Sequence, residues 1–367
     1  MSQSGEGAPG LVQEETSRSG WLWILLALVA VIVLGTVAGR TFYGERTPRI
    51  HELGGGTMGT TWSLRVVLPE GAPAAWVGAI GDTVQARLER INGLMSTWDS
   101  GSELSVFNST RDTAAIPLSE ETIAVLEIAL DVGAASGGAF DVTVEPLVRE
   151  WGFGAGDAKL PEPPAAASLD RLRPLVGLDR LRLDTRDGRL AKAHPDVSVD
   201  LSAVAKGYAL DLAARGVQRM GGSDFALEVG GEVRAHGVKP DGSGWRVAIE
   251  APTPGARTIY RVIELRNEAI ATSGDYRNYV TIGGTRTGHL IDPRTASPVP
   301  WRGFSVSVVH PEAALADAWA TALSVLGPAE GLELAENLGL SAVFVFGSEA
   351  DGFELSATAD VAERLER

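Results

Sequence analysis

The chain has 367 residues, of which 44% are hydrophobic and 22% charged, and it carries a formal net charge of −15 with no cysteine. A chain of this length can bury a large core and form one large domain or two. The acidic balance argues against a nucleic-acid-binding protein, and the absence of cysteine excludes disulfides, zinc–thiolate sites, thiol nucleophiles and a lipid-bearing amino-terminal cysteine.

The amino-terminal part predicts a tail followed by a membrane anchor. Residues 1–20 are polar and rich in Gly, Ser and Glu, which is typical of a disordered segment. Residues 21–39 (WLWILLALVAVIVLGTVAG) carry no charge and span roughly 28 Å as a helix, close to the thickness of a bilayer core. A cleaved signal peptide is the alternative, but the run is long and no A-x-A site follows, so we predict an uncleaved anchor. Because only Arg18 precedes the span and three arginines follow it, the positive-inside rule alone favours a cytoplasmic body.

Residues 40–54 are typical of a linker, and we predict a folded body over residues 55–367. Helical periodicity occurs at residues 77–92, 118–136, 203–220, 311–326 and 329–338, and Ser119 is predicted to cap the second of these helices. An alternating strand follows the glycines near residue 55 and runs to residue 67, and further strand patterns occur at residues 179–183, 197–201, 225–229, 245–250, 261–264, 280–282, 289–291, 304–310, 342–346 and 352–355. Gly283-Gly284 is predicted to form the turn between residues 280–282 and 289–291. Helices and strands mix without a strict βα repeat, so the predicted fold class is α+β, with mixed or antiparallel sheets and packed helices.

One predicted helix offers ligands for a cation. Residues Ala316–Gly327 are rich in alanine and end at Gly327-Pro328, which is a helix stop signal. Asp317 and Thr321 are four residues apart and share one face. A carboxylate and a hydroxyl one turn apart form half a cage for Mg²⁺, and a bound cation would let an acidic protein hold phosphates. The alternative is an exposed aspartate near a helix start, where its charge suits the helix dipole.

Two further stretches combine reactive side chains with suitable backbone. Asp200–Tyr208 leads from a strand end into a helix start, where backbone amides can hold an anion and Lys206 can reach a phosphate or a carboxylate. Asp200 can accept a hydrogen bond from a sugar hydroxyl or a ring N–H; a capping acid and a solvated lysine are the alternative. His289 can serve as a general base near neutral pH, or be a structural histidine bonded to backbone.

Several familiar nucleotide and hydrolase motifs are absent from the sequence. It contains no G-x-G-x-x-G after a strand, no P-loop, no H-E-x-x-H and no G-x-S-x-G elbow. These absences argue against a Rossmann dinucleotide site, a P-loop nucleotidase, a zincin and an α/β-hydrolase.

Taken together, these stretches resemble the FAD:protein FMN transferases, also called ApbE-like flavin transferases. The resemblance runs from about residue 54 to residue 326 and is carried by seven motifs in the family's order. They are TMGTTW at 57–62, MSTW at 95–98, SGGAFDVTV at 136–144, DLSAVAKGY at 200–208, TSGDY at 272–276, HLIDPRT at 289–295 and ADAWAT at 316–321.

The resemblance implies a role for each matching residue. The positions that line the FAD site are Met58, Trp98, Ala139, Phe140, Asp141, Asp200, Lys206 and Ile291, and Trp98 suits stacking on an aromatic ring system. The Mg²⁺ positions are Ala203, Asp317, Ala320 and Thr321, where the two alanines can contribute only carbonyl oxygens. Some relatives carry an acid at the Ala320 position, so the site in this chain is less charged. His289 matches the histidine proposed as the base.

The implied reaction is the Mg²⁺-dependent transfer of FMN from FAD to a serine or threonine hydroxyl of a target protein, with release of AMP. The implied targets are flavoprotein subunits of membrane redox complexes. The family's body usually lies outside the cytoplasm, so we expect an anchor with its amino terminus inside and an extracytoplasmic (periplasmic) catalytic domain, against the weak arginine bias. Two alternatives stay open: a Mg²⁺-dependent FAD pyrophosphatase that yields FMN and AMP, and a protein that binds FAD without turnover.

Overall fold

The structure is a computed structural model, and it describes residues 28–29, 48–154, 162–253, 258–274, 279–300, 303–348 and 352–366. The chain divides into one unit of residues 1–47 and 69–71 and a second of residues 48–68 and 72–367, which contains the body described below. Within the described ranges, no helix combines the length and the apolar character that a membrane span requires. The predicted anchor at residues 21–39 lies outside these ranges except for Leu28 and Val29, which are helical.

The body mixes helices and strands, and a long run of strands from Phe225 to His310 separates the helix Ser202–Arg219 from the helix Ala313–Leu338. Its α-helices are α2 (Ala74–Met95), α3 (Glu103–Ser109), α4 (Glu120–Ala135), α5 (Glu145–Glu150), α6 (Ala166–Leu172), α7 (Ser202–Arg219), α8 (Ala313–Leu338) and α9 (Ala359–Ala362), with 3₁₀ turns η1 (Val142–Val144), η2 (Arg173–Leu175) and η3 (Leu178–Arg180). Its strands are β1 (Pro48–Thr57), β2 (Thr60–Pro69), β3 (Ile116–Pro117), β4 (Leu181–Asp184), β5 (Arg189–Lys192), β6 (Phe225–Val229), β7 (Glu232–His236), β8 (Trp245–Glu250), β9 (Ile259–Leu265), β10 (Ala269–Gly274), β11 (Tyr279–Ile282), β12 (Thr285–Asp292), β13 (Ser297–Pro300), β14 (Phe304–His310), β15 (Ser341–Ser348), β16 (Gly352–Ala357) and β17 (Leu365–Glu366).

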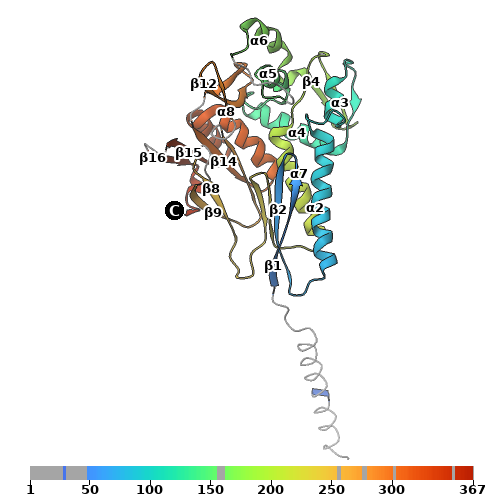
Figure 1. Ribbon diagram of the computed structural model, residues 1–367, viewed down its shortest axis with the longest axis vertical. Coiled ribbons are helices and arrows are strands. Elements are labelled where there is room, and N and C mark those ends of the chain that lie inside the picture. Colours follow the sequence, from blue (N-terminus) through green and yellow to red (C-terminus); the bar gives the residue numbers. More distant parts are fainter. Residues whose placement is uncertain are drawn as a thin grey trace, which may run out of the picture. The chain divides into compact units, whose positions relative to one another are not determined.

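An eight-stranded sheet with the order β1-β2-β6-β7-β10-β14-β15-β16 organises the core (Figure 1). From β2 to β16 in this order, neighbouring strands pair antiparallel. Side chains alternate between the two faces of a strand, so β14 turns Val306 and Val308 to one hydrophobic cluster and Val309 to another. The α+β class with antiparallel sheets and packed helices is confirmed.

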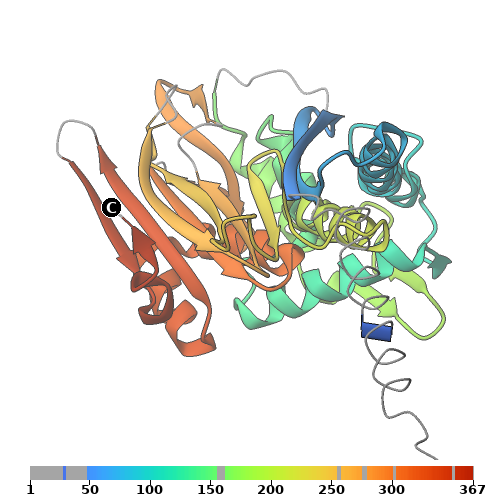
Figure 2. The ribbon, with the colours of Figure 1, turned by 90° about the horizontal axis from the view of Figure 1, so that it is seen from below.

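Helices α7 and α8 pack together on one face of this sheet, and α2 packs beside α7 (Figures 1 and 2). The close approach of α7 and α8 depends on Gly207, because a Cβ at this position would lie 2.2 Å from the Ala313 carbonyl oxygen. A residue without a side chain therefore lets the two backbones touch. On α7, Leu210, Ala214 and Val217 recur at helical spacing and are buried in the core.

Smaller sheets complete the body. The sheet β17-β9-β8 covers the other face of the large sheet, where Trp245 and Ile263 share a buried cluster with Val309. A third sheet, β11-β12-β13, is built on the turn predicted at Gly283-Gly284, which pairs Ile282 with Thr285. Two successive positive φ angles, 56° and 81°, make glycine necessary in that turn. The fourth sheet has the order β3-β5-β4.

Some predicted elements differ from the structure. Strand β1 begins at Pro48, so it includes residues 48–54 of the predicted linker. The strand predicted at residues 197–201 is wrong, because an asparagine side chain rather than a strand pairs with this segment, as described below. The helix stop predicted at Gly327 is confirmed by its φ of 80° and ψ of 176°, although helical structure resumes directly after it. Asp275 and Tyr276 of the TSGDY motif lie outside the described residues.

Candidate active site

Three charged side chains meet where α7, β7 and α8 pack together: Lys206, Glu232 and Asp317, called the charged trio below. Lys206 Nζ donates a hydrogen bond to Glu232 Oε1 and lies 3.6 Å from Asp317 Oδ1. Both carboxylates are buried, with side-chain exposures of 5% for Glu232 and 7% for Asp317. When Glu232 is ionised, two carboxylates and one ammonium leave a net negative charge away from water, where an unpaired charge is costly. The charged trio is therefore suited to attract a cation.

The electrostatics of the charged trio are strongly coupled. Burial lowers the pKa of Lys206, but the charges of Asp317 and Glu232 outweigh it and hold this pKa above its ordinary value, so the ammonium remains charged. Burial raises the pKa of Glu232 to about 7, against the lowering effect of Lys206, and the Asp317 charge adds to the rise. Displaced pKa values in a group of buried charges are common at functional sites.

The backbone of α7 holds Asp317 in place. Asp317 Oδ2 accepts a hydrogen bond of 3.0 Å from the Gly207 N–H. In a regular helix this N–H faces the carbonyl of Ala203, four residues earlier, so the bond brings the beginning of α7 to Asp317. Thr321 is half-buried one turn after Asp317 on the same side of α8.

A cation at this place would depend on oxygen ligands of several kinds. In the part of the chain that is described, no group of three or more His, Cys, Asp or Glu side chains could hold a metal ion. The ligands on offer are the Asp317 carboxylate, the Thr321 hydroxyl and the Ala203 carbonyl, a hard oxygen set that fits Mg²⁺ together with waters. Ala320 is 1% exposed inside α8, so it can offer only a carbonyl that also faces the Ser324 amide.

The segments that carry Asp141 and Asp200 lie side by side. The Asp200 N–H donates a 2.8 Å hydrogen bond to the Val142 carbonyl. Asp141 is buried and accepts hydrogen bonds from the N–H and hydroxyl of Thr143 at 2.8 and 2.6 Å. Burial raises the pKa of Asp141, and the bonds from Thr143 oppose the rise. Asp200 is half-buried and accepts from the Ser202 N–H at 2.8 Å, but the N-cap residue of α7 is Leu201, so Asp200 lies one residue before the cap.

Two polar residues that the sequence did not single out hold the segment before Asp200. The Asn108 amide donates to the Val199 carbonyl and accepts from the Val199 N–H, both at 2.8 Å. The buried Lys192 ammonium donates to the carbonyls of Phe107, Asn108 and Val197. A side-chain amide thus replaces the strand partner that the sequence pattern suggested.

Met58 has an unusual backbone conformation, and Trp98 is unusually exposed for an aromatic residue. Met58 occupies the turn between β1 and β2 with a φ of 46°, which is uncommon for a residue with a Cβ. Its half-buried side chain packs against the main core cluster. Trp98 follows α2 and is 74% exposed, so its indole is available to a ligand or a partner. An exposed tryptophan of this kind is informative because large aromatics are usually well buried.

His289 lies in an irregular part of β12. The pairing of β12 with β13 shifts register between Thr287 and Ile291, and His289 falls inside this irregularity, half-buried. The neighbouring Leu290 packs with Ala139 and with Val325 of α8, just before the interruption at Gly327. Ile291 is 5% exposed and belongs to a separate apolar cluster on the small sheet. Bulged strands often re-aim side chains at functional sites.

The structure brings some predicted residues together and leaves others apart. Lys206 and Asp317 meet directly, and Phe140 belongs to the same core cluster that Met58 and Ala203 contact. Ala139 and the neighbour of His289 share a second cluster, whereas the described contacts do not link Trp98 or Ile291 to the charged trio. Sequence reasoning missed Glu232. Its only signal was its place directly after Gly230-Gly231, a tight turn.

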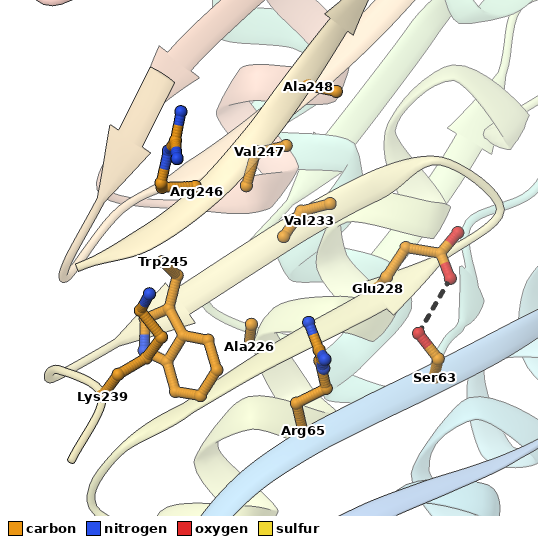
Figure 3. Close-up of a pocket in the computed structure, with 10 residues that line it drawn as sticks. All are labelled: Ser63, Arg65, Ala226, Glu228, Val233, Lys239, Trp245, Arg246, Val247 and Ala248. Atoms are coloured by element: carbon orange, nitrogen blue, oxygen red, sulfur yellow. Dashed lines mark hydrogen bonds between the residues drawn. The ribbon is translucent and has the colours of Figure 1, made fainter. Parts of the chain in front are cut away.

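A separate hollow of about 310 Å³ lies on the other face of the large sheet (Figure 3). Ser63 and Arg65 on β2 line it, whereas the alternate residues Trp62 and Leu64 face the helices. Its remaining lining residues are Ala226, Glu228, Val233, Lys239, Trp245, Arg246, Val247 and Ala248. None of these is a residue predicted for the site.

The chain is similar to known proteins over most of its length. A family profile described as "ApbE family" matches residues 58–344. An FAD:protein FMN transferase from Klebsiella pneumoniae is 38% identical over 304 residues, which cover 82% of this chain and 85% of that protein. An FAD:protein FMN transferase from Vibrio cholerae is 36% identical over 327 residues, which cover 89% of this chain and 95% of that protein.

Solved structures agree with these relatives. The flavin transferase ApbE from Vibrio cholerae superimposes with a TM-score of 0.77 at 34% identity, covering 86% of this chain and 99% of that one. The flavinyl transferase ApbE from Pseudomonas stutzeri, in its apo form, gives a TM-score of 0.77 at 34% identity and covers 86% and 97% of the two chains. The similarity therefore extends over the whole body that carries the charged trio.

Proposed function

This chain belongs to the ApbE family, and we propose that the charged trio and its surroundings form the site of its flavin chemistry. The chain is an enzyme that transfers FMN from FAD to a target protein. In the proposed reaction a serine or threonine hydroxyl of the target attacks the phosphorus on the FMN side of the pyrophosphate. The bond from that phosphorus to the adenylate oxygen breaks, AMP leaves, and a phosphoester joins the flavin to the target.

The observation that carries the proposal is the buried Asp317 carboxylate, fixed by the Gly207 N–H and beside the Lys206 ammonium. Asp317 and Thr321, with the carbonyls of Ala203 and Ala320, would hold Mg²⁺. When bound, Mg²⁺ would offset the charge of the pyrophosphate and of the departing phosphate. Lys206 would add a second positive charge at the same edge, because its ammonium remains charged.

The remaining predicted residues would hold the dinucleotide in place. The exposed indole of Trp98 supports a stacking role for an aromatic ring of FAD. Asp141 and Asp200, on hydrogen-bonded segments, can accept bonds from ring N–H or sugar hydroxyl groups. Met58, Ala139, Phe140 and Ile291 would supply apolar contacts, and the positive φ of Met58 places its backbone at the tip of a tight turn.

His289 is proposed as the base that takes the proton of the target hydroxyl as the new bond forms. Its position in the irregular part of β12, next to Leu290 and hence near Val325 of α8, supports this role. Proton transfer by a positioned side chain typically contributes about 10²- to 10⁴-fold to a rate. We therefore expect His289→Ala to lower the transfer rate by about that factor while FAD binding is retained. The matched control is His194→Ala, an exposed histidine in the loop after β5.

The central experiment incubates the full chain with FAD, Mg²⁺ and candidate acceptor subunits, and measures in-gel flavin fluorescence and AMP release. Transfer gives a fluorescent acceptor with one AMP for each flavin attached. Hydrolysis would give FMN and AMP without a labelled protein, and binding without turnover would give neither. Asp317→Ala is expected to abolish transfer and to keep FAD binding, measured by quenching of flavin fluorescence. Full transfer by this variant would show that the metal assignment is wrong.

The membrane part of the proposal concerns residues outside the described ranges. The uncharged run at residues 21–39 supports an amino-terminal anchor, and we propose an extracytoplasmic body that modifies flavoprotein subunits of membrane redox complexes. A fusion reporter joined to the carboxyl terminus tests the orientation. A reporter active only in the cytoplasm would contradict it.

A further inference from the structure

Glu232 has no part in the reaction as proposed so far, although it is the most enclosed member of the charged trio. Its residue exposure is 4%, and Oε2 has no hydrogen-bond partner among the described residues. It is the first residue of β7, directly after the turn Gly230-Gly231, whose φ angles are 60° and 111°. Val229 pairs with Glu232 across this turn. A short strand-paired turn therefore fixes the backbone of Glu232.

Lys206 is the flexible member of the trio. Its side chain is 34% exposed and has four methylene groups, so its ammonium can lie at more than one place. In the structure the ammonium is within hydrogen-bond distance of Glu232 Oε1. Its ion pair with Asp317 Oδ1 is longer, at 3.6 Å, than its contact with Glu232. The fixed glutamate thus decides where the mobile ammonium rests.

The position of Lys206 matters because Asp317 has two oxygens with different neighbours. Oδ2 already accepts the Gly207 N–H at 3.0 Å, so Oδ1 has the greater free lone-pair capacity for a cation. An ammonium that donated a hydrogen bond to Oδ1 would compete with a metal ion for its lone pairs and would repel that ion.

We propose that Glu232 is a positioning residue that keeps the Lys206 ammonium out of hydrogen-bond contact with Asp317 Oδ1, so that this oxygen stays available to a divalent cation. The inference rests on the cation site of the proposed function. Partners of metal ligands commonly change metal affinity by about 10- to 100-fold when they are removed. Without Glu232, the ammonium has Asp317 as its remaining carboxylate in the trio.

The test measures Mn²⁺ binding to the full chain without FAD, by electron paramagnetic resonance at pH 8. Four proteins form a cycle: the wild type, Glu232→Gln, Lys206→Met and the double variant. We expect Glu232→Gln to weaken Mn²⁺ binding about tenfold or more. Removing Lys206 is expected to have a small effect in the wild type and to restore binding in the Glu232→Gln background. This non-additivity is the signature of positioning, because a simple effect of charge would be the same in both backgrounds.

A second variant keeps the net charge unchanged. Lys206→Arg places a planar fork of donors where one ammonium stood, and the fork can bridge both carboxylates. We expect it to weaken Mn²⁺ binding with Glu232 intact. Circular dichroism melting of every variant checks that the protein folds.

The possible outcomes separate the two proposals. Additive effects in the cycle, or wild-type binding by Glu232→Gln or by Lys206→Arg, would overturn the role of Glu232 and leave the cation site standing. Mn²⁺ binding that is absent from the wild type, or unchanged in Asp317→Asn, would overturn the cation site itself and this inference with it.

Discussion

Two groups of buried charges join the same three elements, α7, β7 and α8, and they differ in how their charges are matched. The first is the charged trio. The second, called the structural pair below, consists of Asp211 on α7 and Arg234 on β7. Asp211 Oδ1 lies 3.0 Å from Arg234 Nη1, and Oδ2 accepts a 3.1 Å hydrogen bond from the Ala314 N–H at the start of α8. Arg234 also donates to the Pro311 carbonyl.

The difference supports a division between a pair that stabilises the fold and a trio that we propose belongs to the active site. In the structural pair the charges cancel: Asp211 Oδ1 has no hydrogen bond among the described residues but lies 3.0 Å from the Arg234 cation, and Oδ2 accepts from the Ala314 N–H. In the charged trio the carboxylates outnumber the ammonium, and Glu232 Oε2 lacks a hydrogen bond among the described residues. A buried group left with unmatched charge is costly in the absence of a ligand. We infer that the protein tolerates this cost at the trio because a cation would offset it.

A substitution at Gly207 would separate α7 from α8 and so disrupt both the charged trio and the structural pair. We expect it to have the largest effect on stability and activity. An alanine Cβ would lie 2.2 Å from the Ala313 carbonyl oxygen and 2.8 Å from Ala314 Cα, so α7 and α8 must move apart. We expect Gly207→Ala to lower the free energy of unfolding by about 3 kcal/mol and to abolish flavin transfer. Urea unfolding and in-gel flavin fluorescence measure the two effects.

The matched control for that variant is Gly78→Ala in α2, where a Cβ would meet no atom within 4 Å. Alanine normally stabilises a helix interior over glycine by about 1 kcal/mol. The two substitutions are therefore expected to change stability in opposite directions. Equal effects would mean that the contact between α7 and α8 is not tight.

Asp317→Asn tests whether the charged trio takes part in flavin transfer. Asparagine can still accept the hydrogen bond from the Gly207 N–H, and Lys206 keeps Glu232 as its partner, so the fold should be maintained. The loss of one charged ligand is expected to lower transfer by about 10²- to 10³-fold, the range found when one transition-state contact is removed. A rate within threefold of the wild type would place the cation elsewhere.

Asp211→Asn is the corresponding change in the structural pair. It leaves the Arg234 guanidinium, whose side chain is 18% exposed, without its counter-ion. Breaking a buried pair in this way costs roughly 3 kcal/mol, so the midpoint of urea unfolding should fall. The folded fraction should transfer flavin at nearly the wild-type rate. If this variant lost activity as Asp317→Asn does, the division between fold and site would not hold.

The features that the sequence predicted correctly depend on local chemistry. Ser119 caps α4 by accepting a hydrogen bond from the Thr122 N–H, and Gly283-Gly284 forms its hairpin turn. Gly327 interrupts α8 because its backbone is not helical. Each of these depends on a few neighbouring residues, so a single sequence contains the information.

The features that it could not predict depend on contacts between distant segments. Residues 197–201 alternate like a strand, yet the partner of Val199 is the side chain of Asn108. Glu232 becomes significant only because α7 and α8 approach closely at Gly207 and bring Lys206 and Asp317 to it. Its role could be found only after the packing of α7, β7 and α8 was known.

The last prediction is the smallest and concerns pH. Burial holds the pKa of Glu232 at about 7 in the folded protein, above its ordinary value of 4.5 in an unfolded chain. A raised carboxyl pKa means that the fold favours the protonated form. This contribution to stability is full below the unfolded pKa of about 4.5 and is lost as pH rises towards 7. The raised pKa of Lys206 adds no pH dependence to the free energy of unfolding in this range, because the ammonium is charged in both the folded and the unfolded protein.

Glu232→Gln removes this titration, so its free energy of unfolding should change less than that of the wild type between pH 5 and pH 8. The expected difference is on the order of a few kcal/mol, since each unit of pKa shift is worth about 1.4 kcal/mol. Urea unfolding with EDTA at four pH values measures it. In Asp211→Asn, the free energy of unfolding should change with pH near pH 7 as it does in the wild type, if Glu232 alone titrates there. Burial raises the pKa of Asp211, but the charged Arg234 beside it opposes this rise. Parallel curves for the wild type and Glu232→Gln would show that Glu232 is ionised across this range, and that the charged trio holds its excess negative charge even below neutral pH.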